Sequence, residues 1–299
     1  MTAPASATRP AFWMISGALS FTVMGGLTHA AGEKCDWLTI AFSRAFFMLV
    51  SSAMAAKLAG APLVVWRPRS LWLRSFAGSF SLVCSFFALT RLPVGEVLTL
   101  TNTYPLWILV LSWVTTKRAP LPFEVIGVVL GLAGLILIEQ PSLSGDTFAA
   151  AVALISSVST ALAMIGLHRL RNVDSRAVVA HFAGVATIIA GIWLILRIVI
   201  TGVPLGPFDG TSALMVLGVG IFGTLGQVFL TKAYAAGAPA RVAVLGLTQV
   251  VFGLGFDVLI WRRSLPLSSI LGTLLILGPT AWLIARASAR PTQAVVSNS

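Results

Sequence analysis

Long apolar stretches alternate with short polar or Pro/Gly-rich breaks along the whole 299-residue chain. Most stretches approach the roughly 20 residues that cross about 30 Å of hydrocarbon as a helix. The breaks, such as GEKCD, KRAPLP and GVPLGPFDG, carry residues that end helices, and none is long enough to hold a soluble domain. The pattern predicts ten membrane-spanning helices at residues 11–31, 37–58, 70–91, 93–116, 122–140, 147–168, 175–200, 211–235, 238–261 and 265–286.

Composition supports a membrane protein. The chain is 57% hydrophobic and 10% charged, whereas soluble domains carry about 25% charged residues. The 27 Gly and 15 Pro scattered along it exclude a long coiled coil. The first apolar stretch is longer than the core of a signal peptide, so we expect it to remain as the first span. The predicted fold class is an all-α polytopic membrane protein.

The net charge of +11 would suggest a nucleic-acid partner in a soluble protein. Here it has a simpler explanation, because Lys and Arg concentrate on the cytoplasmic side of membrane proteins. If the N-terminus is cytoplasmic, fourteen basic residues fall on the inner side of the predicted spans and five on the outer side. We therefore expect both termini to be cytoplasmic, a lipid bilayer around the chain and no nucleic-acid partner.

Catalytic and metal chemistry have little support in the sequence. Cys35 and Cys84 lie far apart and without metal-like spacing, and the three histidines form no HExxH pattern. No GxSxG motif or Walker loop occurs. We predict no enzyme activity, no metal site and no cofactor.

The chain also resembles itself at an offset of 145 residues. This shift aligns TRLPVGEVLTLTNTYPLW with AAGAPARVAVLGLTQVVF, Lys117–Arg118 with Arg262–Arg263, and Gly127 with Gly272. An offset near half the chain predicts two five-helix halves, and an odd number of spans makes the halves enter the membrane from opposite sides. Such inverted repeats are typical of secondary transporters. We expect repeats at residues 1–145 and 146–290 and a disordered tail at 291–299.

Four local features then carry a resemblance to a known family. They are an arginine inside the second span (AFSRAFF), the hinge FALTRLPVGEVLTLTNTYPLW, the Gly-rich fifth span EVIGVVLGLAGLILI, and the second hinge AAGAPARVA. With these features the chain resembles the drug/metabolite transporter superfamily, specifically bacterial EamA-type carriers, including YddG-like amino-acid exporters. The resemblance implies ten helices in which 1, 3, 4, 6, 8 and 9 surround a central cavity. Many members have Gly-Glu after helices 4 and 9, where this chain has Lys117–Arg118 and Arg262–Arg263.

From this resemblance we expect a secondary transporter in a bacterial cytoplasmic (inner) membrane. Its substrate would be a small organic molecule, an amino acid or related metabolite, exported by alternating access, with proton coupling left open. The alternative is a flippase for lipids or amphiphiles, or a membrane scaffold without transport. A lipid path would need polar residues exposed sideways between helices.

The candidate site is predicted from how deep each polar residue lies within the membrane. Helices rise about 1.5 Å per residue, so Thr103 in the fourth span lies near the middle of a core about 30 Å thick. Polar side chains there are functional candidates because facing lipid is costly, although small ones also serve ordinary helix packing. The predicted lining of a central substrate site is Asn102, Thr103, Tyr104, Trp107, Gln227, Thr248, Gln249 and Phe252.

Four ionisable residues are candidates for gating or coupling. Glu96, in the first turn of the fourth span, either complements the helix dipole or acts as an outer gate or proton carrier. Arg44 is too deep for easy snorkelling, so it is either held by carbonyls or a carboxylate or binds an anionic group of the substrate. His29 and His181 are either structural or take part in protonation.

Overall fold

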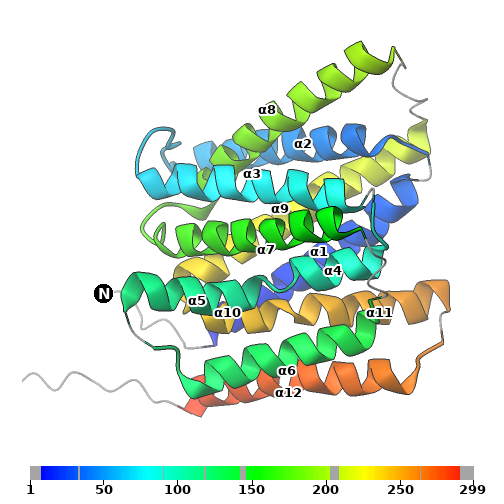
Figure 1. Cartoon of the computed structure of the whole chain (residues 1–299). Helices are drawn as coiled ribbons and strands as arrows, with labels where there is room; N and C mark the ends of the chain where they lie inside the picture. Colours follow the sequence, from blue (N-terminus) through cyan, green and yellow to red (C-terminus); the bar gives the residue numbers. More distant parts are fainter. Residues whose placement is uncertain are drawn as a thin grey trace, which may run out of the picture.

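The computed structural model describes residues 8–32, 34–89, 91–117, 119–141, 146–202, 209–262 and 264–289. Within these ranges the chain folds into twelve helices that run side by side (Figure 1). They are α1 (Arg9–Gly32), α2 (Trp37–Leu58), α3 (Arg69–Leu89), α4 (Val94–Thr101), α5 (Tyr104–Thr116), α6 (Pro122–Glu139), α7 (Thr147–His168), α8 (Ser175–Thr201), α9 (Gly210–Ala236), α10 (Pro239–Gly246), α11 (Thr248–Trp261) and α12 (Leu267–Ala289).

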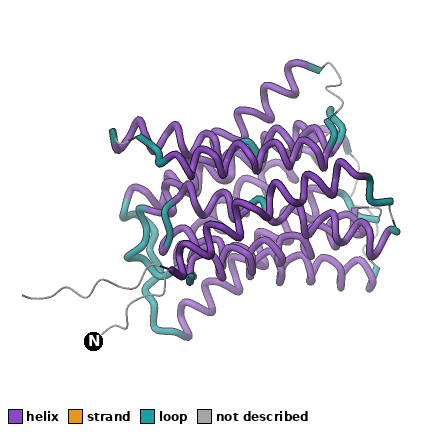
Figure 2. The backbone as a smooth tube through the Cα atoms, turned by 90° about the horizontal axis from the view of Figure 1, so that it is seen from below, coloured by secondary structure: helices purple, strands orange, loops and turns teal. Residues whose placement is uncertain are grey.

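Ten apolar segments of the described chain are long enough to span a membrane. The prediction of ten spans is therefore confirmed, and most limits differ by only one to three residues from those expected. The difference lies in the fourth and ninth spans, each of which is two helices in line: α4 with α5, and α10 with α11. The short connections at both ends of the bundle are visible from below in Figure 2.

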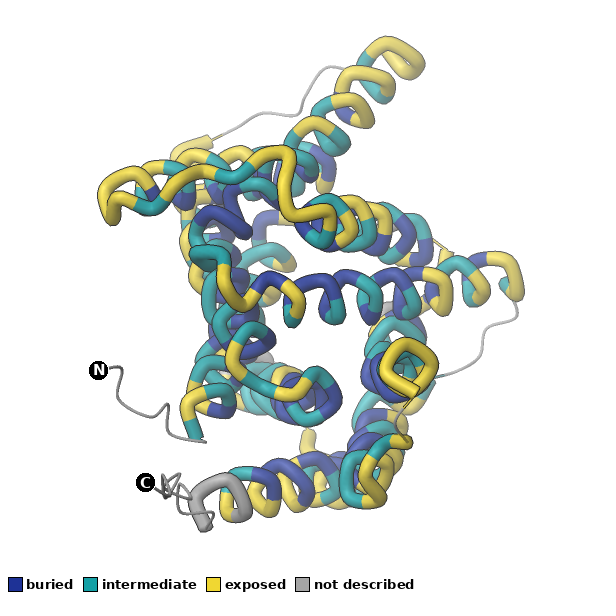
Figure 3. The backbone as a smooth tube through the Cα atoms, turned by 90° about the vertical axis from the view of Figure 1, so that its left-hand side faces the viewer, coloured by how far each residue is buried: buried dark blue, intermediate teal, exposed yellow. Residues whose placement is uncertain are grey.

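Helices from the two halves pack against each other in reciprocal pairs. α1 packs along α9, and α7, which corresponds to α1, packs along α3, which corresponds to α9. α2 pairs with α8, and α6 pairs with α12. These pairings follow the pseudo-two-fold relation expected of an inverted repeat. Figure 3 shows the bundle end-on, with buried positions turned towards neighbouring helices.

The 145-residue offset between the repeats also relates the first and last residues of corresponding helices. α4 begins at Val94 and α10 begins at Pro239, 145 residues later. α5 ends on the left-handed Lys117 (φ 56°) and α11 on the left-handed Arg262 (φ 51°), again 145 residues apart. The expected boundary at residue 145 and the tail 291–299 lie outside the described residues.

Glycines bring α6 and α12 close together. A Cβ on Gly134 would lie 2.5 Å from the carbonyl oxygen of Gly272, and one on Gly127 would lie 3.8 Å from Cβ of Pro279. The two-fold relation exchanges these contacts, because Gly127 and Gly272, like Gly134 and Pro279, are 145 residues apart. Small residues that let helix backbones approach are typical of membrane helix packing.

The two ends of the bundle differ in charge. We call the end where α1 begins and α12 finishes the terminal end, and the other the opposite end. At the opposite end three aspartates each cap a helix through a backbone N–H and also form an ion pair with a basic residue elsewhere in the sequence. The ion pairs are Asp36 with Arg197 (2.9 Å), Asp146 with Arg91 (3.9 Å) and Asp209 with Lys34 (3.5 Å). The described basic residues at this end are thus largely neutralised.

Candidate functional site

The two helix breaks have local causes in the sequence. Pro105 has no N–H to bond the carbonyl of Thr101, which would be its partner in a continuous helix, and α4 ends at Thr101. The hydroxyls of Thr103 and Thr248 donate to the carbonyl oxygens three residues earlier, those of Leu100 (2.6 Å) and Leu245 (2.7 Å). Both bonds recur at the 145-residue offset, so the same device stabilises each break.

The breaks also meet in space. The Tyr104 hydroxyl at the start of α5 lies where a side chain on Gly246 would begin, 2.6 Å from its Cβ position. Leu247, between α10 and α11, likewise occupies the space next to Gly131 of α6. Tyr234 of α9 is fully buried, with its hydroxyl close to that of Tyr104. The chain's two tyrosines therefore mark the contact between the breaks.

The side chains around the breaks differ in how far their polar groups are engaged. The Thr103 hydroxyl also lies 3.0 Å from the hydroxyl oxygen of Ser157 in α7, and Thr248 is buried. The amide nitrogen of Asn102 donates to the carbonyl oxygen of Leu98 (2.8 Å). Gln249 is exposed, and within the described residues its side-chain amide has no hydrogen-bond partner. Asn102 and Gln249 thus keep polar atoms available, while the two threonine hydroxyls are occupied.

The two aromatic candidates lie about one turn after the breaks, in α5 and α11. Trp107 is partly buried and its Nε1 has no hydrogen-bond partner in the described part of the chain. Phe252, 145 residues later, is also partly buried. A buried indole N–H without an acceptor is unusual. Trp107 therefore remains a candidate for donating to a bound molecule.

The side chain of Gln227 is hydrogen-bonded to another side chain. It is buried in α9, and its Oε1 accepts a hydrogen bond of 2.9 Å from Nη2 of Arg74 in α3. Arg74 is one of the fourteen basic residues that fall on the inner side if the N-terminus is cytoplasmic, but its side chain is buried in the bundle rather than exposed at a helix end. It lies more than one turn inside α3, is 2% exposed, and stacks on the ring of Phe182 at 4.1 Å. The missed signal was a lone arginine in an apolar run, SLWLRSFAG, similar to that around Arg44.

Arg44 enters the same region from α2. Its Nε lies 2.9 Å from the Cβ position of Gly223 in α9, and this buried atom has no hydrogen-bond partner within the described residues. Gly223 is the midpoint of α9, the fourteenth of its 27 residues. Arg44 therefore reaches the centre of the bundle, at the depth expected from its position in the span.

The remaining ionisable candidates lie away from this centre. Glu96 is 2% exposed in the first turn of α4 at the opposite end. His29 is exposed in the last turn of α1. His181 in α8 is tied into the terminal end, with Nδ1 2.8 Å from the Ser75 hydroxyl and Nε2 3.1 Å from the carbonyl oxygen of Val65. Both of its ring nitrogens are therefore engaged in hydrogen bonds.

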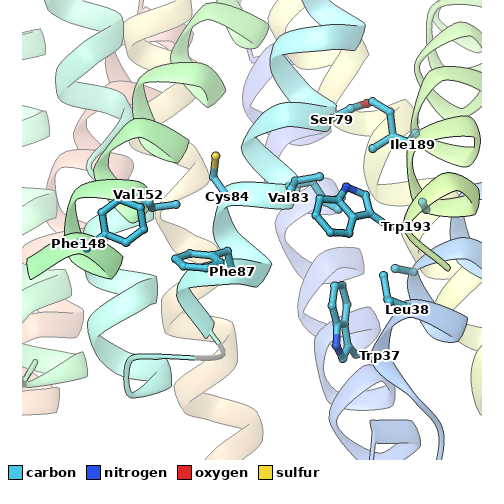
Figure 4. A pocket seen from close by; sticks show the side chains of 14 residues that line it. Trp37, Leu38, Ser79, Val83, Cys84, Phe87, Phe148, Val152, Ile189 and Trp193 are labelled. Atoms are coloured by element: carbon cyan, nitrogen blue, oxygen red, sulfur yellow. The ribbon is translucent and has the colours of Figure 1, made fainter. Parts of the chain in front are cut away.

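A separate cavity of about 360 Å³ lies between α2, α3, α7 and α8 (Figure 4). Its walls are almost entirely apolar, with Trp37, Phe87, Phe148 and Trp193 among them, and Ser79 contributes the only lining hydroxyl. None of the predicted lining residues faces this cavity. The polar candidates and this apolar space are thus two distinct features of the molecule.

Comparisons with known proteins agree with this architecture. The profile of the EamA-like transporter family matches residues 8–140 and again residues 143–285. The pseudopaline exporter CntI of Pseudomonas aeruginosa is 26% identical over 264 residues, covering 88% of this chain and 91% of that protein. An uncharacterized transporter of Helicobacter pylori is 29% identical over 213 residues, covering 70% of this chain and 71% of that protein.

Two further proteins are similar to this chain. Human solute carrier family 35 member G1 is 24% identical over 211 residues, covering 64% of this chain and 56% of that protein. One solved crystal structure superposes with a TM-score of 0.79 at 22% identity, covering 97% of this chain and all of the other. At that identity the likeness shows the fold alone.

Proposed function

This chain belongs to the EamA-like transporter family, and from that premise we propose that it exports small organic solutes, amino acids or related metabolites, by alternating access. Its relatives are transporters and exporters, which supports transport of small solutes across a membrane rather than catalysis.

We further propose a bacterial inner-membrane location with the terminal end in the cytoplasm. The neutralised basic residues at the opposite end support that orientation, because unpaired Lys and Arg favour the cytoplasmic side.

One observation carries the proposal. The fourth and ninth spans are broken at positions 145 residues apart, and the breaks touch through Tyr104 and Gly246. Discontinuous helices at the midplane, one from each inverted repeat, are the usual construction of substrate sites in secondary transporters. Asn102 and Gln249 at these breaks offer polar atoms to a solute. We propose that rocking of the two repeats around this contact exposes the site alternately to each side.

The alternative function, movement of lipids or amphiphiles, has one observation in its favour. The 360 Å³ cavity is apolar, and its aromatic residues Trp37, Phe148 and Trp193 are themselves exposed on the outside of the bundle. An acyl chain fits such a surface better than an amino acid does. The polar residues, however, are concentrated at the helix breaks and along α9 rather than on this cavity.

Reconstitution into liposomes tests the proposal. We expect counterflow of at least one solute from a panel of amino acids, nucleosides and organic anions, with no acceleration of lipid scrambling. Empty liposomes control for leakage. The Gly246→Ala variant, which disturbs the contact between the two breaks, is compared with the wild type. Accelerated scrambling without flux of any solute would favour the flippase and overturn the transporter proposal.

A further inference from the structure

We propose that Arg44 and Arg74 together form a binding site for a small organic dicarboxylate beside the middle of α9. This inference rests on the proposed transport function and gives it a substrate class. The starting point is the pairing of charges. The five ion pairs of the described chain involve Lys34, Arg91, Arg176, Arg197 and Arg241, and each of these basic residues has a carboxylate partner. Arg44 and Arg74 have none within the described residues.

A buried and a partly buried guanidinium group inside the bundle, those of Arg74 and Arg44, are costly without a carboxylate partner. Arginine stays protonated at any physiological pH, and a charge inside a membrane protein is retained where it pairs with another group or lines a pathway. Arg74 receives partial compensation from the Gln227 carbonyl and the Phe182 ring. No acceptor for Arg44 is found within the described residues. A visiting anion would supply the missing negative charge.

Glycines at corresponding positions of the two repeats leave room for the two guanidinium groups. The guanidinium of Arg74 covers Gly78 in its own helix, where a Cβ would collide with Nη1. Nε of Arg44 covers Gly223 of α9 in the same way. Gly78 and Gly223 are 145 residues apart, so each repeat leaves the same position open for an arginine. A Cβ on Gly166 of α7 would lie 3.3 Å from the backbone nitrogen of Arg74, so this glycine also leaves room beside Arg74.

The two arginines reach one face of α9. Arg44 contacts Gly223 and Arg74 contacts Gln227, four residues or about 6 Å further along the helix axis. Together the two groups carry about ten N–H donors, and one of these has a hydrogen-bond acceptor among the described residues. A guanidinium binds a carboxylate through two parallel hydrogen bonds. A short chain with a carboxylate at each end therefore suits two guanidinium groups whose contacts on α9 lie about one helical turn apart.

Binding of glutarate to the purified full-length protein, measured by isothermal titration and by thermal stabilisation in detergent, tests the site. Butyrate, which has one carboxylate, and inorganic phosphate are the comparison ligands. We expect glutarate to bind at least about tenfold more tightly than butyrate or phosphate, since each added charge-assisted pair contributes strongly. Equal binding of glutarate and butyrate, or preference for phosphate, would overturn the dicarboxylate assignment.

Variants locate the binding. R44Q and R74Q should each weaken glutarate binding about tenfold or more, whereas R69Q, an exposed arginine at the start of the same helix as Arg74, should bind as the wild type does. If either glutamine variant does not fold, Gly223→Ala displaces Arg44 without removing its charge and should also weaken binding. Gly278→Ala is its control, because nothing lies within 4 Å of that Cβ position. Equal loss in R69Q would point to general surface charge and refute the site.

Counterflow of labelled glutarate in proteoliposomes separates this inference from the proposed function. Glutarate binding that needs both arginines, without flux of any solute, would leave the site standing and remove the transport function. Flux of other solutes without glutarate binding would leave the transport function standing and remove the site.

Discussion

The hydroxyl of Tyr104 lies over the backbone of Gly246, so that the helix break of one repeat touches that of the other. Gly246→Ala would place a methyl group 2.6 Å from this hydroxyl and 2.9 Å from the Met14 methyl. We expect the variant to lose about 1–3 kcal/mol of stability, the usual cost of overpacking, visible as a lower melting temperature in detergent. The double variant Gly246→Ala/Tyr104→Phe should regain part of the loss, because it removes the closer contact. Additive losses would mean that the two residues do not interact.

Asn102 and Gln249 carry the next prediction. Asn102→Ala or Gln249→Leu should lower solute flux several-fold, since both remove polar atoms offered at the breaks, while expression and melting temperature stay near wild type. Thr115→Ala is the matched control, because that exposed hydroxyl bonds only to its own helix. Wild-type flux in both variants would remove these residues from the substrate site.

We expect Glu96 to have a structural role rather than a role in proton coupling. It is buried in the first turn of α4, where an acidic group complements the helix dipole. Glu96→Gln should therefore keep the pH profile of transport and change only the melting temperature. Flux measured across a range of pH values decides, and a flattened profile would make Glu96 a proton-coupling residue instead.

Asp174 offers a pH prediction at the terminal end. It caps α8 through the N–H of Arg176 (2.8 Å), and the Arg176 side chain lowers the pKa of its carboxyl group. A carboxyl group whose pKa is lower in the folded protein than in the unfolded chain stabilises the fold at pH values above the ordinary aspartate pKa of about 3.9. This contribution is lost as the pH falls through the pKa of the group in the folded protein. Asp174→Ala should cost about 1 kcal/mol at neutral pH, and the difference from wild type should shrink in acid. Asp174→Asn, which keeps a capping oxygen, should lose less.

The contact between α6 and α12 gives a further test. Gly134→Ala would bring a Cβ to 2.5 Å from the carbonyl oxygen of Gly272, a backbone atom that cannot rotate away. We expect a loss of about 1–3 kcal/mol, measured as a lower melting temperature. Gly278→Ala on α12, which meets nothing within 4 Å, should be close to neutral. A neutral Gly134→Ala would show that the two helices separate easily.

The sequence predicted the spans well because hydrocarbon thickness sets their length. The 145-residue offset was also readable, since paired turns and basic residues recur along the chain. The helix breaks were missed, because a proline inside a span is common and hydroxyls like those of Thr103 and Thr248 also bond back to carbonyl oxygens within continuous helices, as that of Thr115 does. The burial of Arg74 was not predicted, because it depends on Phe182 and Gln227, which lie more than 100 residues away in the chain.

The reciprocal packing of α6 on α12 has an evolutionary consequence. A half-length ancestor inserted in both directions could have formed the same contact as a homodimer, since Gly134–Gly272 and Gly127–Pro279 are one interaction seen twice. In such a dimer every residue would occur on both sides of the axis. Arg44 and Arg74 do not: Ile189 and Val219 stand at their counterparts. A single chain that carries both halves is free of that constraint, so one half can hold charge at positions where the other has none.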